Sequence, residues 1–252
     1  MDLGLEDRAV LVTGGSRGIG RAVALAYARE HARVAVTYHE DEEAALSVVK
    51  RSAAAGGDGF ALRLDLADRS SIEAAVRDAA ERLDGLDVVV ANAIQWPTDA
   101  AGPLAAIEPE NWERALRVNL EGTTATVRAS LPYLVRSDAG RLILISSGVS
   151  RDGMPGATAY ATAKAGLDGL VAALKWEVGQ RGVLVNIVSP GFTVTRGNRE
   201  RFPEQVRESR RADTPSKKLS DPGDVAPAIL FLGSPANGNI TGAYLPVAGG
   251  ID

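Results

Sequence analysis

The sequence of 252 residues contains no cysteine, only two histidines, and few aromatic residues, which make up 5% of the chain. The lack of cysteine excludes disulfides, thiolate metal sites and a cysteine nucleophile. A zinc site or a Ser-His-Asp triad would have to use His31 or His39, because these are the only imidazoles. We therefore expect no metal site and no histidine-based nucleophilic catalysis.

An excess of positive charge and a long hydrophobic run are missing as well. The net charge of −4 argues against a dedicated nucleic-acid binder, because neutralising phosphates requires clustered excess cations. No apolar run approaches the roughly 20 residues that cross a bilayer, and the first residues lack the basic and apolar regions of a signal peptide. We expect a cytoplasmic protein without nucleic-acid or membrane partners.

What the chain does contain is a regular alternation of strand-like and helical segments. Most of the strand-like runs are continuously apolar, which is typical of strands covered by helices on both faces. The seven runs occupy residues 8–13, 33–38, 59–64, 86–91, 141–146, 183–189 and 243–247. Between them, Ser70-x-x-Glu73 has the pattern of a helix-starting capping box. We predict one doubly wound, Rossmann-type α/β domain over residues 1–252, with a mostly parallel seven-stranded sheet and helices on both faces.

Residues 192–218 interrupt this alternation. They show no strand pattern, and their eight Arg and Lys residues outnumber four Asp and Glu residues. We expect a helical flap that covers the carboxyl edge of the sheet. A solvated surface helix is the alternative explanation for its charges.

A glycine-rich loop, Thr13-Gly14-Gly15-Ser16-Arg17-Gly18-Ile19-Gly20, connects the first expected strand to the first expected helix. Gly14 permits a tight turn, Gly18 lets the backbone approach a pyrophosphate, and Gly20 lets helix and strand pack closely. The N-terminus of the helix offers free N–H groups and the positive end of a dipole. The spacing differs from the more familiar G-x-G-x-x-G, but its place after the first strand favours dinucleotide binding.

Tyr160 and Lys164 lie four residues apart in an expected helix over residues 157–181, so their side chains share one face. A neighbouring ammonium favours the phenolate, which lowers the pKa of a tyrosine and lets it exchange protons near neutral pH. Strand alternation allows only one of Ser146 and Ser147 to face this pair. A serine hydroxyl in that place can donate to a substrate oxygen as charge builds on it.

These landmarks and several others resemble the classical short-chain dehydrogenase/reductase family, and within it 3-oxoacyl-carrier-protein reductases and polyketide ketoreductases. The resemblance covers nearly the whole chain. Its landmarks are the 13–20 loop, Asp65-Leu66, Asn92-Ala93, Asn119, Ser146-Ser147, Tyr160-x-x-x-Lys164, Pro190-Gly191 and Gly249-Gly250. The family spacing selects Ser147 as the active serine. The resemblance implies Ser147, Tyr160 and Lys164 as catalytic residues, with Asn119 helping to hold a water that links the lysine to solvent.

The resemblance also implies a nicotinamide cofactor, NADP(H). The residues that it assigns to the cofactor are Gly14, Ser16, Arg17, Gly18, Ile19, Gly20, Thr37, Tyr38, His39, Asp65, Leu66, Asn92, Ala93, Tyr160, Lys164, Pro190, Gly191, Thr193 and Thr195. NADP is favoured over NAD because the second strand ends without the acid that usually binds the ribose hydroxyl. Arg17 lies where the family often uses a cation for the 2′-phosphate. We interpret the acids at positions 40–43 as the start of the next helix.

The sequence departs from the family after the fourth strand, where Ile94 replaces a glycine. A β-branched residue there requires a shifted loop or a side chain near the nicotinamide, unless the change is neutral. The pocket residues that we expect are Ile94, Gln95, Trp96, Met154 and Phe192.

Taken together, these features predict an NADPH-dependent ketoreductase in which Tyr160 donates a proton. The substrate would be a small-molecule carbonyl, either a polyketide or aromatic ketone or a 3-oxoacyl thioester on a carrier. The alternatives are an NAD-dependent dehydrogenase of a sugar or steroid alcohol, and a non-catalytic NADP sensor. Related enzymes form dimers or tetramers through the helices that we expect at 109–135 and 157–181, so a homo-oligomer is expected. Trp112 and Trp176 on these helices would serve either that interface or internal packing.

Overall fold

A computed structural model describes residues 2–251. Its seven strands form one sheet in which all neighbours are parallel, in the order β3-β2-β1-β4-β5-β6-β7. The strands are β1 (Ala9–Val12), β2 (Arg33–Tyr38), β3 (Asp58–Arg63), β4 (Val88–Ala91), β5 (Arg141–Ile145), β6 (Leu184–Pro190) and β7 (Tyr244–Val247). Every expected strand is present, with ends that differ by at most two residues. The single doubly wound domain predicted from the sequence is therefore confirmed, and the sheet is wholly parallel.

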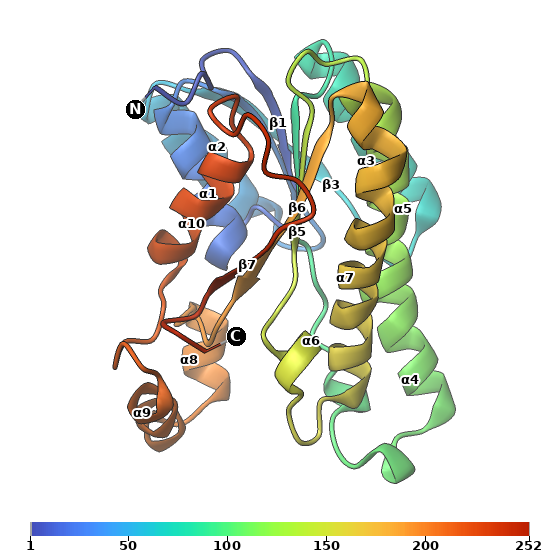
Figure 1. The fold of residues 1–252 in the computed structure, drawn as a ribbon, viewed down its shortest axis with the longest axis vertical. Coiled ribbons are helices and arrows are strands. Elements are labelled where there is room, and N and C mark those ends of the chain that lie inside the picture. The colour runs from blue at the N-terminus through green and yellow to red at the C-terminus, as the bar shows by residue number, and fades with distance from the viewer. Residues whose placement is uncertain (1, 252) are drawn as a thin grey trace.

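Helices cover both faces of this sheet (Figure 1). One face carries α1 (Gly18–Arg29), α2 (Glu42–Ala54) and α10 (Pro222–Leu232). The other carries α3 (Arg69–Leu83), α5 (Gly122–Leu134) and α7 (Thr158–Val178). The central strands β1, β4 and β5 are buried along their whole length, which explains why their sequences are continuously apolar.

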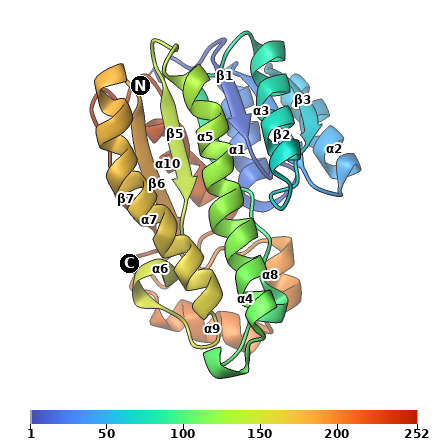
Figure 2. The same ribbon diagram turned by 90° about the vertical axis from the view of Figure 1, so that its right-hand side faces the viewer.

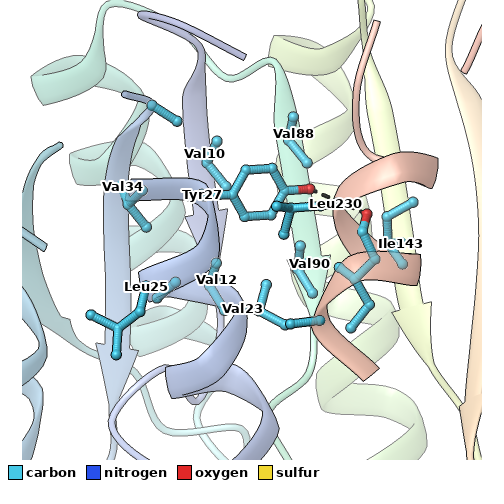
Figure 3. Close-up of a cluster of buried hydrophobic side chains, with 14 of the residues drawn as sticks. Val10, Val12, Val23, Leu25, Tyr27, Val34, Val88, Val90, Ile143 and Leu230 are labelled. Atoms are coloured by element: carbon cyan, nitrogen blue, oxygen red, sulfur yellow. Dashed lines mark hydrogen bonds between the residues drawn. The ribbon is translucent and has the colours of Figure 1, made fainter. Parts of the chain in front are cut away.

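Two hydrophobic clusters, one on each face, make up most of the core. In the first, Tyr27 of α1 is fully buried among valines of the central strands (Figure 3). Its hydroxyl donates to the carbonyl of Ile229 on α10 at 3.4 Å. Burial raises the pKa of Tyr27, so this phenol stays neutral and ties α1 to α10.

The beginning of α3 differs from the sequence-based expectation. Asp68, not Ser70, caps the helix, and its carboxylate accepts from the backbone N–H groups of Ser70 and Ser71. Glu73 pairs with Arg69 on the helix surface instead. The predicted capping box at Ser70 was therefore wrong, because Asp68, two residues earlier, is the residue whose side chain caps the helix.

The expected helix over 109–135 has an interruption. It consists of α4 (Pro109–Leu116), a π-helical turn η3 (Arg117–Glu121) and α5. Short 3-10 turns η1 (Thr98–Ala100) and η2 (Leu104–Ala106) precede it, and η4 (Gly179–Arg181) follows α7. No helix within residues 2–251 is long and apolar enough to cross a membrane.

The carboxyl end of the sheet is surrounded by the least regular part of the molecule. Figure 2 shows α4, α6 (Val149–Asp152), α8 (Arg196–Arg201) and α9 (Glu204–Asp213) gathered at that end. The two helices α8 and α9 belong to the 192–218 segment, which we call the flap. The parallel strands thus direct their ends, and the residues that follow them, toward this one region.

Candidate active site

The glycine loop between β1 and α1 has the backbone that its sequence predicts. Gly14 and Gly18 have φ of +63° and +56°, which lie in the left-handed region that favours glycine. A Cβ on Gly20 would lie 2.3 Å from the carbonyl oxygen of Gly14, so a side chain cannot be accommodated. The cap residue Arg17 makes no side-chain hydrogen bond to the first turn of α1. The loop is therefore a narrow cradle of backbone at a helix N-terminus, suited to a diphosphate.

Side chains that we assigned to the cofactor hold this loop in place. The amide of Asn92 donates to the carbonyls of Thr13 and Gly14 at 2.9 and 3.2 Å. The hydroxyl of Thr37 is buried and accepts from the N–H of Gly14 at 3.1 Å. The N–H of Ala93 donates to the Thr13 hydroxyl. Asn92 and Thr37 thus hydrogen-bond to the loop itself. Ser16 lies in the loop, Ile19 in the first turn of α1, and Leu66 after β3.

The end of β2 and the residue after β3 meet beside this loop. Nε2 of His39 lies 3.3 Å from Oδ2 of Asp65, and Tyr38 hydrogen-bonds to Glu42, which raises the Tyr38 pKa. Asp41 caps α2, and Glu42 and Glu43 form its first turn. The interpretation of these acids as a helix start is confirmed for Glu42 and Glu43, whereas Glu40 and Asp41 precede the helix.

Ser146 and Ser147 point in different directions at the end of β5, as the pleat requires. The Ser146 hydroxyl is buried and donates to Asp168 of α7 at 2.8 Å. The Ser147 hydroxyl accepts weakly from the N–H of Val149 at 3.4 Å and interacts with the phenol of Tyr160. The structure therefore brings Ser147, not Ser146, together with the tyrosine.

Lys164 lies one turn beyond Tyr160 on α7 and is buried. Its Nζ donates to the carbonyl of Ile145 at 2.7 Å and lies 5.9 Å from the centroid of the Tyr160 ring. Burial lowers the pKa of Lys164 to about 8, and the charge of Asp168 opposes this shift. The lysine therefore titrates near neutral pH, where a proton can be gained or lost easily.

The pKa of Tyr160 differs from the sequence-based expectation. It is raised, because burial disfavours the phenolate more strongly than neighbours stabilise it. The groups that lower it are the Ser147 hydroxyl and then the charge of Arg201. The expectation that Lys164 lowers this pKa is corrected: in this geometry the ammonium is bound to a carbonyl, and Tyr160 is a neutral acid.

Two residues that the sequence analysis missed support this group. The carboxylate of Asp168 accepts from Ser146 and from Ser150, both at 2.8 Å, so it binds the loop on either side of Ser147. Tyr244 of β7 donates to the carbonyl of Ser147 at 3.3 Å. Asp168 could have been found, because it lies four residues after Lys164 on the same helix face. No sequence pattern points to Tyr244, because it comes near Ser147 only through the pairing of β7 with the rest of the sheet.

Asn119 lies in the π turn and is buried. Its amide nitrogen donates to the carbonyls of Gln95 and Ala115, and its oxygen accepts from the N–H of Gln95. Both amide hydrogens are thus used on backbone. Asn119 joins the helix to the loop that carries Gln95 and Trp96.

Trp96 connects the tyrosine to the flap. Its ring lies 4.8 Å from that of Tyr160, centroid to centroid, at an interplanar angle of 43°. On the flap side, the guanidinium carbon of Arg201 lies 4.7 Å from the Trp96 ring centroid. Arg201 was not identified from the sequence because an exposed arginine on a charged helix carries no special pattern.

The remaining pocket residues are distributed around this stack. Phe192 packs edge-on against Phe202 of the flap, with centroids 5.2 Å apart. Met154 is part-buried after α6, and Ile94 is 40% exposed. Ile94 is thus partly exposed after the end of β4.

The residues after β6 lead from the sheet into the flap. Pro190 ends the strand, and the Thr193 hydroxyl donates to the carbonyl of Gly191 at 3.1 Å. Thr195 caps α8 and lies beside the glycine loop, since a Cβ on Gly18 would be 3.4 Å from its methyl group. The base of the flap therefore borders the diphosphate cradle.

Comparison with known proteins defines the class. Residues 14–252 match the sequence model of a family described as enoyl-(acyl carrier protein) reductase. The 3-oxoacyl-[acyl-carrier-protein] reductase FabG of Staphylococcus aureus is 33% identical over 97% of this chain and 98% of its own. The chain belongs to the short-chain dehydrogenase/reductase family. It is an oxidoreductase that acts on CH–OH or C=O groups.

Two solved structures show the same fold with different cofactors. A short-chain dehydrogenase from Burkholderia cenocepacia in complex with NADP is 33% identical, with a TM-score of 0.90 and coverage of 98% of this chain and 99% of that one. A 7α-hydroxysteroid dehydrogenase complexed with NADH and 7-oxo glycochenodeoxycholic acid is 27% identical, with a TM-score of 0.93 and coverage of 99% and 96%. The family thus binds a nicotinamide cofactor, and both types occur among the relatives.

Proposed function

We propose that this protein is an NADPH-dependent ketoreductase. The observation that carries the proposal is the meeting of the Ser147 hydroxyl with a neutral Tyr160 phenol, beside a buried Lys164 with a pKa of about 8. Three elements, β5, α7 and β7, supply the atoms that hold this group. Such an arrangement offers two hydroxyl donors to one carbonyl oxygen.

The described residues fit a nicotinamide cofactor. Gly14 and Gly18 take left-handed backbone, and Gly20 leaves no room for a side chain beside the Gly14 carbonyl, so we assign the diphosphate to this loop at the start of α1. His39 and Asp65 would border the adenosine, and Pro190, Gly191, Thr193 and Thr195 the carboxamide end. When bound, a dihydronicotinamide supplies the hydride.

The protein's own residues then position the carbonyl and provide the proton. Ser147 donates a hydrogen bond to the carbonyl oxygen and orients it. Tyr160 gives its phenolic proton to that oxygen as negative charge develops. Lys164 returns a proton toward Tyr160, because its pKa of about 8 lets it give one up near neutrality. We propose that Asn119 holds the Gln95–Trp96 loop against Tyr160. We also propose that it helps to hold a water that links Lys164 to solvent.

NADP is favoured over NAD by charge at the adenosine end. Arg17 is exposed and, within residues 2–251, forms no ion pair, so it is available to a 2′-phosphate. The Asp65 carboxylate at this end lies 3.3 Å from Nε2 of His39. The test is the ratio of kcat/KM with NADPH to that with NADH, with Arg17→Ala expected to reverse or abolish a preference for NADPH.

We propose a polyketide-like or aromatic ketone, or a 3-oxoacyl thioester on a carrier, as substrate. Support comes from the aromatic pairs Trp96–Tyr160 and Phe192–Phe202 and from the 3-oxoacyl-[acyl-carrier-protein] reductase among the relatives. NADPH oxidation with a 3-oxoacyl thioester, a polycyclic quinone ketone and a diketone would test this. Tight NADPH binding without turnover on any carbonyl would favour a non-catalytic sensor instead.

We also propose that the protein forms a homo-oligomer, commonly a tetramer in this family, and works in the cytoplasm. Trp176 on α7 is 76% exposed, whereas Trp112 on α4 packs within its own chain against Ala100, Ala115 and Ala159. The internal-packing alternative therefore applies to Trp112 and not to Trp176. Sedimentation of wild type and Trp176→Glu would test the interface.

A further inference from the structure

The cations of the flap fall into two groups. Three of the six arginines on α8 and α9 pair with acids of their own helix. These pairs are Arg196–Glu200, Arg207–Glu204 and Arg211–Glu208. Arg199, Arg201 and Arg210 form no salt bridge among residues 2–251, and of these three only Arg201 has its guanidinium against an aromatic ring, that of Trp96. Arg201 is therefore a flap cation that faces the active site with its charge uncompensated by an acid.

The position of Arg201 relative to the reacting atoms is set by Trp96. Both the guanidinium and the Tyr160 ring lie against the Trp96 indole, at 4.7 and 4.8 Å from its ring centroid. Asn119 fixes the backbone just before Trp96 through two hydrogen bonds to Gln95, of 2.9 and 3.0 Å. Trp96, which both groups contact, therefore follows a stretch of backbone that Asn119 holds in place.

A guanidinium that stacks on a ring uses its face and keeps the N–H groups at its edge for acceptors. Those N–H groups form a planar fork that matches the oxygens of a carboxylate or a phosphate. Trp96, in turn, presents a flat apolar surface of the kind that packs against a ring. The three side chains together offer a proton donor, an apolar platform and an anion receptor around one indole.

We infer that Arg201 binds an anionic group on the substrate, so that the preferred substrates are ketones with a carboxylate or phosphate about one ring's width from the carbonyl. This inference rests on the proposed function, because it requires the carbonyl to lie at Ser147 and Tyr160. Arg201 acts as a specificity residue: it selects the substrate, while the proton still comes from Tyr160.

The test compares pairs of ketones of which one carries an anionic group and the other a neutral group in the same position. The probes are 4-acetylbenzoate with its methyl ester, and 4-acetylphenyl phosphate with the corresponding methyl ether. Arg201→Gln is expected to lower kcat/KM for the charged probe at least about tenfold, mainly through KM, and to change that for its neutral partner less than about twofold. The anion with the larger loss identifies the group that Arg201 recognises. Arg199→Gln is the control, since Arg199 is an exposed arginine on the same helix, and it should leave both probes unchanged.

Equal losses on charged and neutral probes, or no loss on either, would overturn the role of Arg201 without affecting the proposed ketoreductase. If wild type reduces none of the probes, the proposed function is in doubt for this class of ketone, and calorimetry still decides the role of Arg201. In that measurement 4-acetylbenzoate is titrated into NADPH-saturated protein. Weaker binding in Arg201→Gln, but not in Arg199→Gln, supports the inference, and equal affinity in all three proteins overturns it.

Discussion

The catalytic edge of the sheet and the flap are built in different ways, although they border the same site. At the edge, Lys164 binds the Ile145 carbonyl, and the segment that carries Ser147 is held by hydrogen bonds to Asp168 and Tyr244 from distant parts of the chain. In the flap, exposed arginines pair with acids three or four residues away on the same helix. Contacts of the first kind require the whole fold, whereas those of the second kind form within a single helix.

This difference separates two tasks. Proton transfer needs atoms placed to within a few tenths of an ångström, and buried networks from several elements provide that. Substrate choice tolerates a softer wall, and exposed ion pairs contribute little to stability. We therefore expect substitutions at the edge to change rate, pH dependence and folding stability, and substitutions in the flap to change substrate preference alone.

The largest effect is expected for Tyr160→Phe. Removing the phenolic proton should lower kcat about 1000-fold, the range of general acid catalysis, while the affinity for NADPH stays near that of wild type. Steady-state kinetics and a fluorescence titration of NADPH measure the two quantities. Tyr133→Phe on α5, away from the site, is the control. Retained turnover in Tyr160→Phe would show that the proton has another source.

Lys164→Met should stabilise the folded protein while abolishing its activity. At pH 7 the buried ammonium is destabilising, because its pKa falls from 10.5 to about 8 on folding. Allowing for the lost hydrogen bond to Ile145, the gain is on the order of 2 kcal/mol. Wild type should become more stable as pH rises from 8 toward 10.5, since the folded lysine loses its proton first.

Urea unfolding at pH 7 and at pH 10 measures this change. Lys164→Met should lack the rise with pH, and Lys50→Met, at an exposed position of α2, should behave as wild type. A less stable Lys164→Met at pH 7 would mean that the charged amine contributes to folding.

Asp168→Asn is expected to have a smaller effect, about tenfold on kcat. The substitution removes the charge that raises the Lys164 pKa, so this pKa falls further below 8 and the alkaline limb of the pH–rate profile moves to lower pH. It also removes one acceptor for Ser146 or Ser150. Glu177→Gln, on an exposed turn of α7, is the matched control. An unmoved alkaline limb would limit Asp168 to a structural role.

The smallest effect is expected in the flap. Glu200→Gln breaks the pair with Arg196, whose side chain is 94% exposed, and solvent screens such pairs strongly. We expect no measurable change in the urea midpoint or in kcat. A clear loss of stability would contradict the contrast between the two regions and show that the flap is folded cooperatively with the sheet.

The fold could be predicted from sequence because each central strand is buried on both faces and is therefore continuously apolar. Errors lie at element ends, as at β4, which begins at Val88 and not at residue 86, and at the π turn that interrupts the expected 109–135 helix. The capping box at Ser70 failed for a local reason: several residues near a helix start can cap it, and only the backbone decides among them.

The site was predictable as far as short-range spacing reaches. The row of Tyr160, Lys164 and Asp168 follows from helical periodicity, although its last member was overlooked. Arg201 and Tyr244 reach the site through tertiary packing of the flap and of the last strand, which leaves no local pattern. The sequence also misses the raised pKa of Tyr160, because burial is a property of the folded molecule.

The π turn between α4 and α5 also determines how α4 is rotated about the helix axis relative to α5. A π turn accommodates one residue more than an α-helical turn, and each residue of a helix advances it by about 100°. Deleting Leu120 would therefore turn α4 by that angle relative to α5 and carry Asn119 away from Gln95. The one extra residue in this turn thus determines the direction from which Asn119 approaches the loop that carries Trp96.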